Sequence, residues 1–277
     1  MARVIAQKLS EGLGKQVVVD NRPGGAGNIA TELAIKAPAD GHTALMGNIG
    51  PLTVNPSLYK LSFDPLSDLA PVTQIAAAPL LIVVHPSLPV TSLKGLIALA
   101  RREPGRMSYS SAGAGSAPHL AGTLFNLQAK LDITHIPYKG AAPALIDLIA
   151  GQVQLSFPPL PSGAAHVKTG RLKALAVTSA KRSSLFPALP TASEAGLKDY
   201  EVTTWYGLLL PNGTPREIIA RLHNETAKAL RLADVTDKLT VDGAEPVGST
   251  PEEFHELMRN ETLKWAAVIK SSGMRAE

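Results

Sequence analysis

Apolar and polar positions along the chain alternate between the period of β-strands and the period of α-helices. At the N-terminus, an apolar stripe that stops at Gly14 predicts a helix. The apolar run at residues 16–20 then predicts a short buried strand, and a Gly-rich turn leads into a second helix. Strands are expected at 42–47 and 80–84, with a Pro-rich surface segment between them. The first of these strands ends in the polar residues 48–51, where α/β sheets tend to place ligands.

The same alternation continues to the C-terminus. The expected strands cover residues 106–109, 133–138, 153–157, 172–178 and 202–210. The expected helices cover residues 93–100 after the N-cap Ser92, 120–131, 145–149 before Gly151, 216–232 and 251–271. Repeated strand–helix units of this kind predict an α/β fold with two layers and mainly parallel sheets.

Residues 110–116 connect an expected strand to an expected helix and have little or no side chain. Such residues let a ligand approach the backbone closely. The free amides of the following helix start and the positive end of its dipole favour an anion such as a carboxylate. The hydroxyl groups of Ser111 and Ser116 are expected to add two donors. The alternative is a flexible connection in which Ser116 only caps the helix.

Composition narrows the function classes. The chain has 277 residues, enough for two domains, and 18% of them are charged. The net charge of +4 is spread along the chain, and no aromatic residues interleave with the basic pairs, so we expect a small anion rather than nucleic acid as partner. The absence of cysteine excludes disulfides and thiolate metal sites. No apolar run approaches the ~20 residues of a membrane span, and no signal peptide is recognised after Met1.

Signals of catalysis are thin. Residues 25–30 fit the dinucleotide pattern G-x-G-x-x-A, but the next strand ends without a carboxylate for a ribose. His255 and Glu256 lack the second histidine of the zinc motif H-E-x-x-H. Ser116 and His119 lie one turn apart at one helix start, a geometry that does not suit proton transfer between them. Three aspartates are expected to be solvated: Asp132, Asp147 and Asp199. We therefore predict no enzyme activity, no metal and no cofactor.

Six short segments, in one order and spacing, resemble a known receptor family. They are DNRPGGAGNI at 20–29, NPSLY at 55–59, SAGAGS at 111–116 followed by His119 and Leu120, PYKG at 137–140, LAVTS at 175–179 and GAEP at 243–246. Each is weak alone, but together they are specific. The chain resembles the Bug-type solute receptors, the periplasmic binding proteins of tripartite tricarboxylate transporters, over nearly its whole length.

The resemblance implies a two-lobed periplasmic-binding-protein fold of the flytrap type, with two crossing strands and a small carboxylate held where the lobes close. We expect residues 1–98 and 205–277 to form the first lobe and residues 99–204 the second. The family implies no catalysis and no cofactor. It implies a small organic acid with one or two carboxylates as ligand, membrane transporter subunits as partners, a monomeric state and a periplasmic location.

In that family, one loop of each lobe holds the ligand carboxylate through backbone amides, hydroxyl groups and bridging waters. The second-lobe loop matches this chain from Ser111 to Ser116. The ligand-binding residues expected there are Ser111, Ala112, Gly113, Gly115, Ser116 and His119. Asn48 and Ile49 are expected to contribute from the first lobe, and Tyr138 and Pro158 to shape the distal pocket. The alternative for Asn48 and Tyr138 is turn capping and packing.

Two departures from the family pattern limit which of its properties can be expected of this chain. Its members open with a strand and a Pro/Gly-rich ligand loop before the helix that begins here at Ala2. We therefore expect the reading frame upstream of Met1 to encode a signal peptide, that strand and that loop. The family often has Asp-Asn after the strand matching residues 153–157, whereas Pro158 and Pro159 stand here. The ligand specificity of a typical member is therefore not carried over.

Two other function classes stay open on the sequence. An α/β hydrolase or dehydrogenase needs a nucleophile or a cofactor fingerprint, and saturable binding without turnover would count against it. The effector lobe of a transcription regulator shares a similar architecture and predicts an attached helix-turn-helix, which these residues do not encode.

Overall fold

The computed structural model describes residues 1–241 and 243–276, and these divide into two compact units. Unit 1 comprises Met1–Ala77 and Trp205–Ile269, and unit 2 comprises Ala78–Thr204 with the residues from Lys270 onwards. The chain passes between the units within strand β2 (Leu69–Pro79), within strand β8 (Thr203–Pro211) and near the end of helix α11 (Pro251–Ser272).

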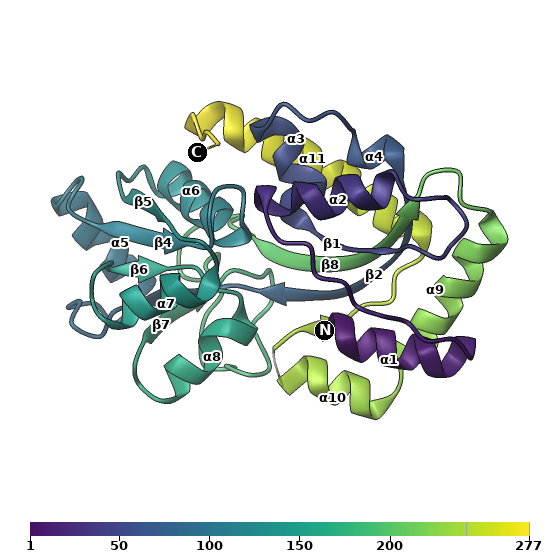
Figure 1. Ribbon diagram of the computed structural model, residues 1–277. Coiled ribbons are helices and arrows are strands. Elements are labelled where there is room, and N and C mark those ends of the chain that lie inside the picture. Colours follow the sequence, from purple (N-terminus) through teal and green to yellow (C-terminus); the bar gives the residue numbers. More distant parts are fainter. Residues whose placement is uncertain (242, 277) are drawn as a thin grey trace. The chain divides into compact units, whose positions relative to one another are not determined.

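The sheet of unit 1 has four strands in the order β1-β8-β2-β9 (Figure 1). Strand β1 (Leu45–Asn48) pairs antiparallel with β8, and β9 (Glu245–Pro246) pairs antiparallel with β2. The helices of this unit are α1 (Ala2–Leu13), α2 (Asn28–Ile35), α3 (Asn55–Leu58), α4 (Pro65–Asp68), α9 (Arg216–Leu230), α10 (Ala233–Val241) and α11. Helix α1 packs against α9 through the buried face of Ile5 and Leu9.

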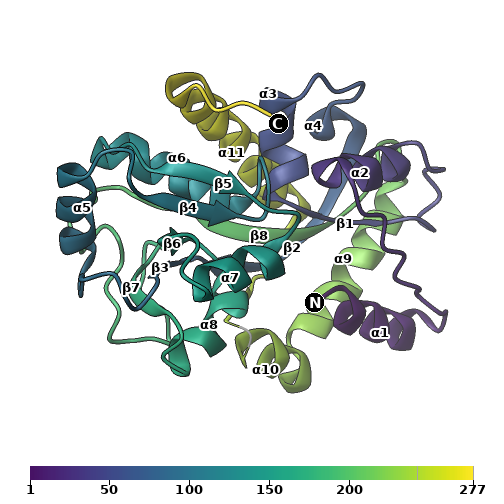
Figure 2. The same cartoon turned by 60° about the vertical axis from the view of Figure 1, so that its left-hand side comes forward.

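The sheet of unit 2 has five strands in the order β5-β4-β6-β3-β7. Their bounds are β3 (Leu81–Val84), β4 (Ser108–Ser111), β5 (Thr134–Pro137), β6 (Leu155–Ser156) and β7 (Lys173–Val177). The helices are α5 (Leu93–Arg102), α6 (Ala117–Ala129), α7 (Ala141–Ile149) and α8 (Leu160–Lys168). Helix α6 lies on one face of the sheet, and α7 and α8 lie on the other (Figures 1 and 2).

The structure confirms the two-lobed α/β fold, and it refines two details. The sheet of unit 2 is mixed rather than mainly parallel, because β3 pairs antiparallel with β6 and β7 while β4 pairs parallel with β5 and β6. In the sheet of unit 1, the pairings of β1 with β8 and of β2 with β9 are antiparallel. The compact units also differ from the lobes drawn on the sequence, 1–98 with 205–277 and 99–204. Residues 78–98 and those from Lys270 onwards belong to the second unit.

The predicted strand at residues 16–20 is wrong. Val18 is 74% exposed, and the amide of Val17 donates to Ser10 Oγ at 2.8 Å instead of to a neighbouring strand. An apolar run becomes a strand only where a partner strand accepts its backbone groups. The converse error is β2, an eleven-residue strand where the sequence predicts a Pro-rich surface segment.

Helix boundaries with a cap agree closely with prediction. Gly14 adopts φ 63° after α1, Gly151 adopts φ 75° after α7, and Ser92 Oγ accepts the amide of Gly95 at the start of α5. Helices α8 and α10 are not predicted from the sequence. Helix α8 follows Pro158 and Pro159 and also contains Pro161. Pro161 lies in the first turn, where a backbone amide has no acceptor within the helix, so its missing N–H costs no helical hydrogen bond.

Candidate functional site

The connection from β4 to α6 is a tight glycine loop, defined here as residues 112–116. Gly113 adopts φ 113° and Gly115 adopts φ 74°, conformations that residues with a side chain rarely take. A Cβ atom on Gly113 would lie 3.3 Å from the carbonyl oxygen of Tyr138, so the loop also passes close to the neighbouring backbone. The glycines expected to let a ligand approach are therefore required by the loop conformation itself.

The hydroxyl groups of Ser111 and Ser116 both donate to the backbone of the glycine loop. The carbonyl of Gly113 accepts from Ser116 Oγ at 2.7 Å, from the Ser116 amide at 3.2 Å and from Ser111 Oγ at 3.2 Å. Ser116 is the N-cap residue of α6, but its side chain makes no capping bond. Ser111 is 1% exposed. The hydroxyls that the sequence assigns to a ligand thus stabilise the shape of the loop in this structure.

Four backbone amides of the glycine loop and the first turn of α6 have no acceptor among the described residues. Within the described part of the chain, no hydrogen bond is donated by the amides of Ala112, Ala114, Ala117 and His119. Pro118 contributes no donor because it has no N–H. Helix α6 has thirteen residues, so its dipole places partial positive charge at the same end. The segment therefore offers neutral donors and a favourable field to an anion.

Two histidines lie beside the loop, and only one of them belongs to the predicted site. His119 Nδ1 accepts the amide of Gly115 at 3.3 Å. His135, on β5, lies with Nε2 2.6 Å from Ser111 Oγ, and that oxygen accepts the amide of Gly113 at 3.1 Å. The two imidazole rings are stacked, with centroids 3.7 Å apart and planes 7° from parallel.

Both imidazoles are neutral at physiological pH. Burial and, to a smaller extent, the adjacent His135 lower the pKa of His119 to about 3. Burial lowers the pKa of His135 to about 4. The sequence singles out His119 through its motif but treats His135 as an ordinary strand residue. The parallel pairing of Tyr109 with His135 brings it to the loop.

Tyr138 and Pro158 have structural partners in unit 2. The Tyr138 hydroxyl donates to Asp147 Oδ2 at 2.7 Å, so Asp147 is not simply solvated as predicted. Partial burial, together with that carboxylate, raises the pKa of Tyr138 to about 12. Pro158 is buried, and its carbonyl accepts the amide of Leu81 at 2.9 Å. The packing role left open for Tyr138 therefore has direct support.

The predicted residues of unit 1 lie at the end of β1. Asn48 Oδ1 accepts the amide of Gly50 at 3.1 Å, which is the turn-capping alternative. Ile49 is 1% exposed, and its carbonyl accepts from Thr53 Oγ1 at 2.7 Å. Asn55, from the NPSLY segment, is fully buried and donates to the carbonyl of Ala26 at 3.1 Å. It thereby connects two of the sequence segments that indicate the family.

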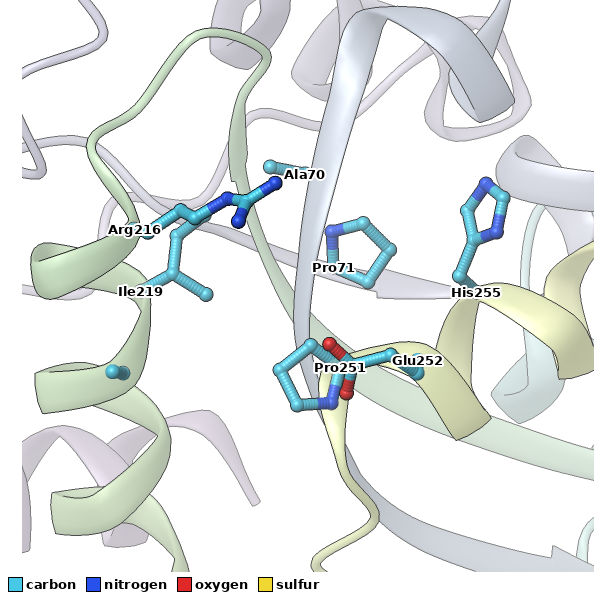
Figure 3. Close-up of a pocket in the computed structure, with 8 residues that line it drawn as sticks. Ala70, Pro71, Arg216, Ile219, Pro251, Glu252 and His255 are labelled. Carbon is cyan, nitrogen blue, oxygen red and sulfur yellow. The ribbon is translucent and has the colours of Figure 1, made fainter.

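Two hollows, one in each unit, differ in their relation to the predicted site residues. A hollow of about 540 Å³ in unit 1 is lined by residues of β2, α9 and α11, and none of them belongs to the predicted site. Figure 3 shows these lining residues. A hollow of about 470 Å³ in unit 2 is lined by His119 and His135 along one face of α6. In the described residues, no three His, Asp or Glu side chains are grouped to hold a metal ion, and no helix has the length and apolar character needed to cross a membrane.

Comparison with known proteins agrees with the sequence motifs. The profile of a family described as tripartite tricarboxylate transporter family receptor matches residues 1–274. Protein BugT of Bordetella pertussis is 37% identical over 277 residues, covering 99% of this chain and 85% of that protein.

Solved structures give the same result. The Rpa4515 protein of R. palustris, solved with adipate, superposes with a TM-score of 0.93 at 40% identity, covering 100% of this chain and 93% of that one. MatC from Rhodopseudomonas palustris, with bound malate, superposes with a TM-score of 0.88 at 30% identity, covering 97% and 92%. The family match over almost the whole sequence, supported by these relatives, shows that this chain belongs to the tripartite tricarboxylate transporter receptor family.

Proposed function

We propose that this receptor binds one carboxylate of a small mono- or dicarboxylic acid at its glycine loop. The observation that carries the proposal is the group of four backbone amides, in the glycine loop and the first turn of α6, that have no acceptor among the described residues. A carboxylate can accept several hydrogen bonds at once, and bonds to a charged acceptor are roughly twice as strong as neutral ones. The dipole of α6 further favours a carboxylate at this end of the helix.

The relatives support the chemical class of the ligand. One related structure was solved with adipate and another with malate, both aliphatic dicarboxylates. Asn48 and Ile49 of unit 1, and Tyr138 and Pro158 of unit 2, are proposed as further contacts to the ligand. Membership of the family supports delivery of the ligand to membrane subunits of a tripartite transporter. A periplasmic, monomeric receptor is part of the same proposal.

The test is isothermal titration calorimetry with adipate and malate, each compared with its neutral diamide. If the amides hold a charged carboxylate, the diamide loses a charge-assisted bond at about 1.5–3 kcal/mol, which corresponds to roughly 10- to 150-fold weaker binding. Asp132→Ala, which alters an exposed carboxylate outside the loop, is the control and is expected to bind like the wild type. Equal affinities for acid and diamide would refute the carboxylate loop.

A further inference from the structure

The glycine loop is connected to β5 and α6 through a pair of histidines. His119 accepts a hydrogen bond from the amide of Gly115. His135 is hydrogen-bonded to the Ser111 hydroxyl, which accepts the amide of Gly113. The rings are stacked with their centroids 3.7 Å apart, so each imidazole packs directly against the face of the other. The histidine pair, meaning His119 and His135, therefore joins both glycine amides of the loop to regular secondary structure.

We propose that the histidine pair positions the carboxylate site by providing the acceptors for two amides of the loop. His119 accepts the amide of Gly115, and His135 holds the Ser111 hydroxyl that accepts the amide of Gly113. The amides of Ala112 and Ala114 are then the donors that the loop offers to the ligand. This inference rests on the proposed carboxylate site and adds which donors bind and what selects them. His119 and His135 act on the ligand through the loop. They are positioning residues, together with Ser111.

The hydrogen bonds define which ring nitrogen each histidine uses. Nδ1 of His119 accepts an N–H, so in the neutral ring the proton is on Nε2. Nε2 of His135 faces a hydroxyl that already accepts the Gly113 amide, so this oxygen has its own proton to donate to the ring or to the Gly113 carbonyl. A protonated His119 would place an N–H against the Gly115 N–H and break that bond. The neutral pair is thus the form that holds the loop.

This use of particular nitrogens separates positioning from simple packing. A packing role requires only a side chain of suitable volume, whereas positioning requires a polar atom at one place on the ring. The side-chain amide of asparagine places a polar atom near the Nδ1 position of histidine, and that of glutamine near the Nε2 position. His119→Asn and His135→Gln are therefore the conservative changes, and His119→Gln and His135→Asn are matched changes with the polar atom misplaced.

The experiment measures all four variants in two ways. Adipate affinity is measured by calorimetry on protein whose folding is checked by circular dichroism. Hydrogen exchange of the Gly113 and Gly115 amides is measured by NMR without ligand. His166→Gln, which changes a histidine of α8 in the same unit, is the control. We expect His119→Asn and His135→Gln to stay within about threefold of wild type, and the misplaced variants to bind about tenfold or more weakly.

The exchange data make the outcome independent of the ligand. We expect the Gly115 amide to exchange about tenfold faster in His119→Gln than in His119→Asn, and the Gly113 amide likewise in His135→Asn compared with His135→Gln. Identical exchange within each pair would overturn the proposal even if adipate binds. If wild type fails to distinguish adipate from its diamide while the exchange differences remain, the carboxylate assignment is wrong and the histidine pair still orders the loop.

Discussion

At the scale of single residues, two glycines of unit 2 provide a matched test of the loop. Gly113 adopts φ 113° and Gly140 adopts φ 116°, so alanine strains the backbone similarly at both, by about 1–3 kcal/mol. We expect both Gly113→Ala and Gly140→Ala to lower the free energy of unfolding. Only Gly113→Ala is expected to weaken carboxylate binding, by about tenfold or more, because it alone changes the loop. Chemical denaturation and calorimetry on both variants check this, and equal affinities would contradict it.

The histidine pair also predicts how stability depends on pH. Its folded pKa values of about 3 and about 4 lie below the ordinary value of 6.5. The unfolded chain therefore binds more protons than the folded chain between these values. The contribution is fully present above pH 6.5 and decreases as the pH falls towards 4, by up to about 1.4 kcal/mol per pH unit for each histidine.

Urea denaturation between pH 7.5 and 4.5 measures this slope, with the double variant His119→Asn/His135→Gln as comparison. The variant is expected to lose less stability on acidification, because no imidazole remains to be protonated there. Tyr109, Lys130 and Asp132 line the same hollow and are unchanged in both proteins. Parallel pH dependences of the two proteins would rule out the histidine contribution.

The sequence predicts the shape of the glycine loop better than the hydrogen-bond partners of the residues around it. The glycines and the helix start at Ala117 follow from local pattern, because backbone conformation is a local property. The contact of Ser111 with His135 depends on strand pairing, and the bond of Tyr138 to Asp147 depends on the position of α7, so neither could be read from spacing. The bond of Ser116 to the Gly113 carbonyl is local, but its direction depends on the conformation of the loop. His135 reaches the loop only through the pairing of β5 with β4. Whether the predicted residues contact the ligand stays a prediction.

At the scale of elements, Gly122 is where α6 packs on the sheet. A Cβ atom there would overlap the ring of Tyr109 on β4. Gly122→Ala is therefore expected to destabilise the protein by about 1–3 kcal/mol through overpacking, although alanine is the better helix former. Gly95→Ala in α5 is the control, since its Cβ would meet only ordinary contacts from 3.4 Å and should stabilise by about 0.5–1 kcal/mol. A stabilising Gly122→Ala would mean that α6 can move away from β4.

Elements with their own start and stop signals are the ones that the sequence predicts well. Ser92 and Gly14 act within one helix, so their signals need no distant partner. Residues 16–20 and β2 show the opposite case. The first has a strand-like pattern without pairing, and the second pairs with β8 and β9 in spite of its prolines. The sequence of helix α10 has no start or stop signal that distinguishes it from the residues on either side, so the sequence does not predict this helix.

At the scale of the whole molecule, each unit has its own core, and both tryptophans of the chain are buried in unit 1. Trp205 is 1% exposed and packs edge-on against Phe254, and Trp265 is 0% exposed. Tryptophan fluorescence thus reports unfolding of unit 1, whereas far-UV circular dichroism reports both units. Two-state behaviour is not the general rule for chains with two such units.

We expect Gly122→Ala, in unit 2, to separate the two signals in a urea titration, with the dichroism changing at lower urea than the fluorescence. The mirror variant is Gly207→Ala in unit 1, whose Cβ would overlap the ring of Phe254. It is expected to shift the fluorescence transition to lower urea. Coincident transitions in both variants would show that the units unfold together.

The position of β8 in its sheet has a consequence for synthesis on the ribosome. Strand β8 lies between β1 and β2, although 123 residues of chain, 80–202, separate the end of β2 from the start of β8. Nearly all of unit 2 leaves the ribosome in that interval and can fold at once, whereas β1 and most of β2 must wait without their shared neighbour. Unit 1 is therefore the later unit to form, and its apolar strands are exposed the longest to aggregation and to chaperones.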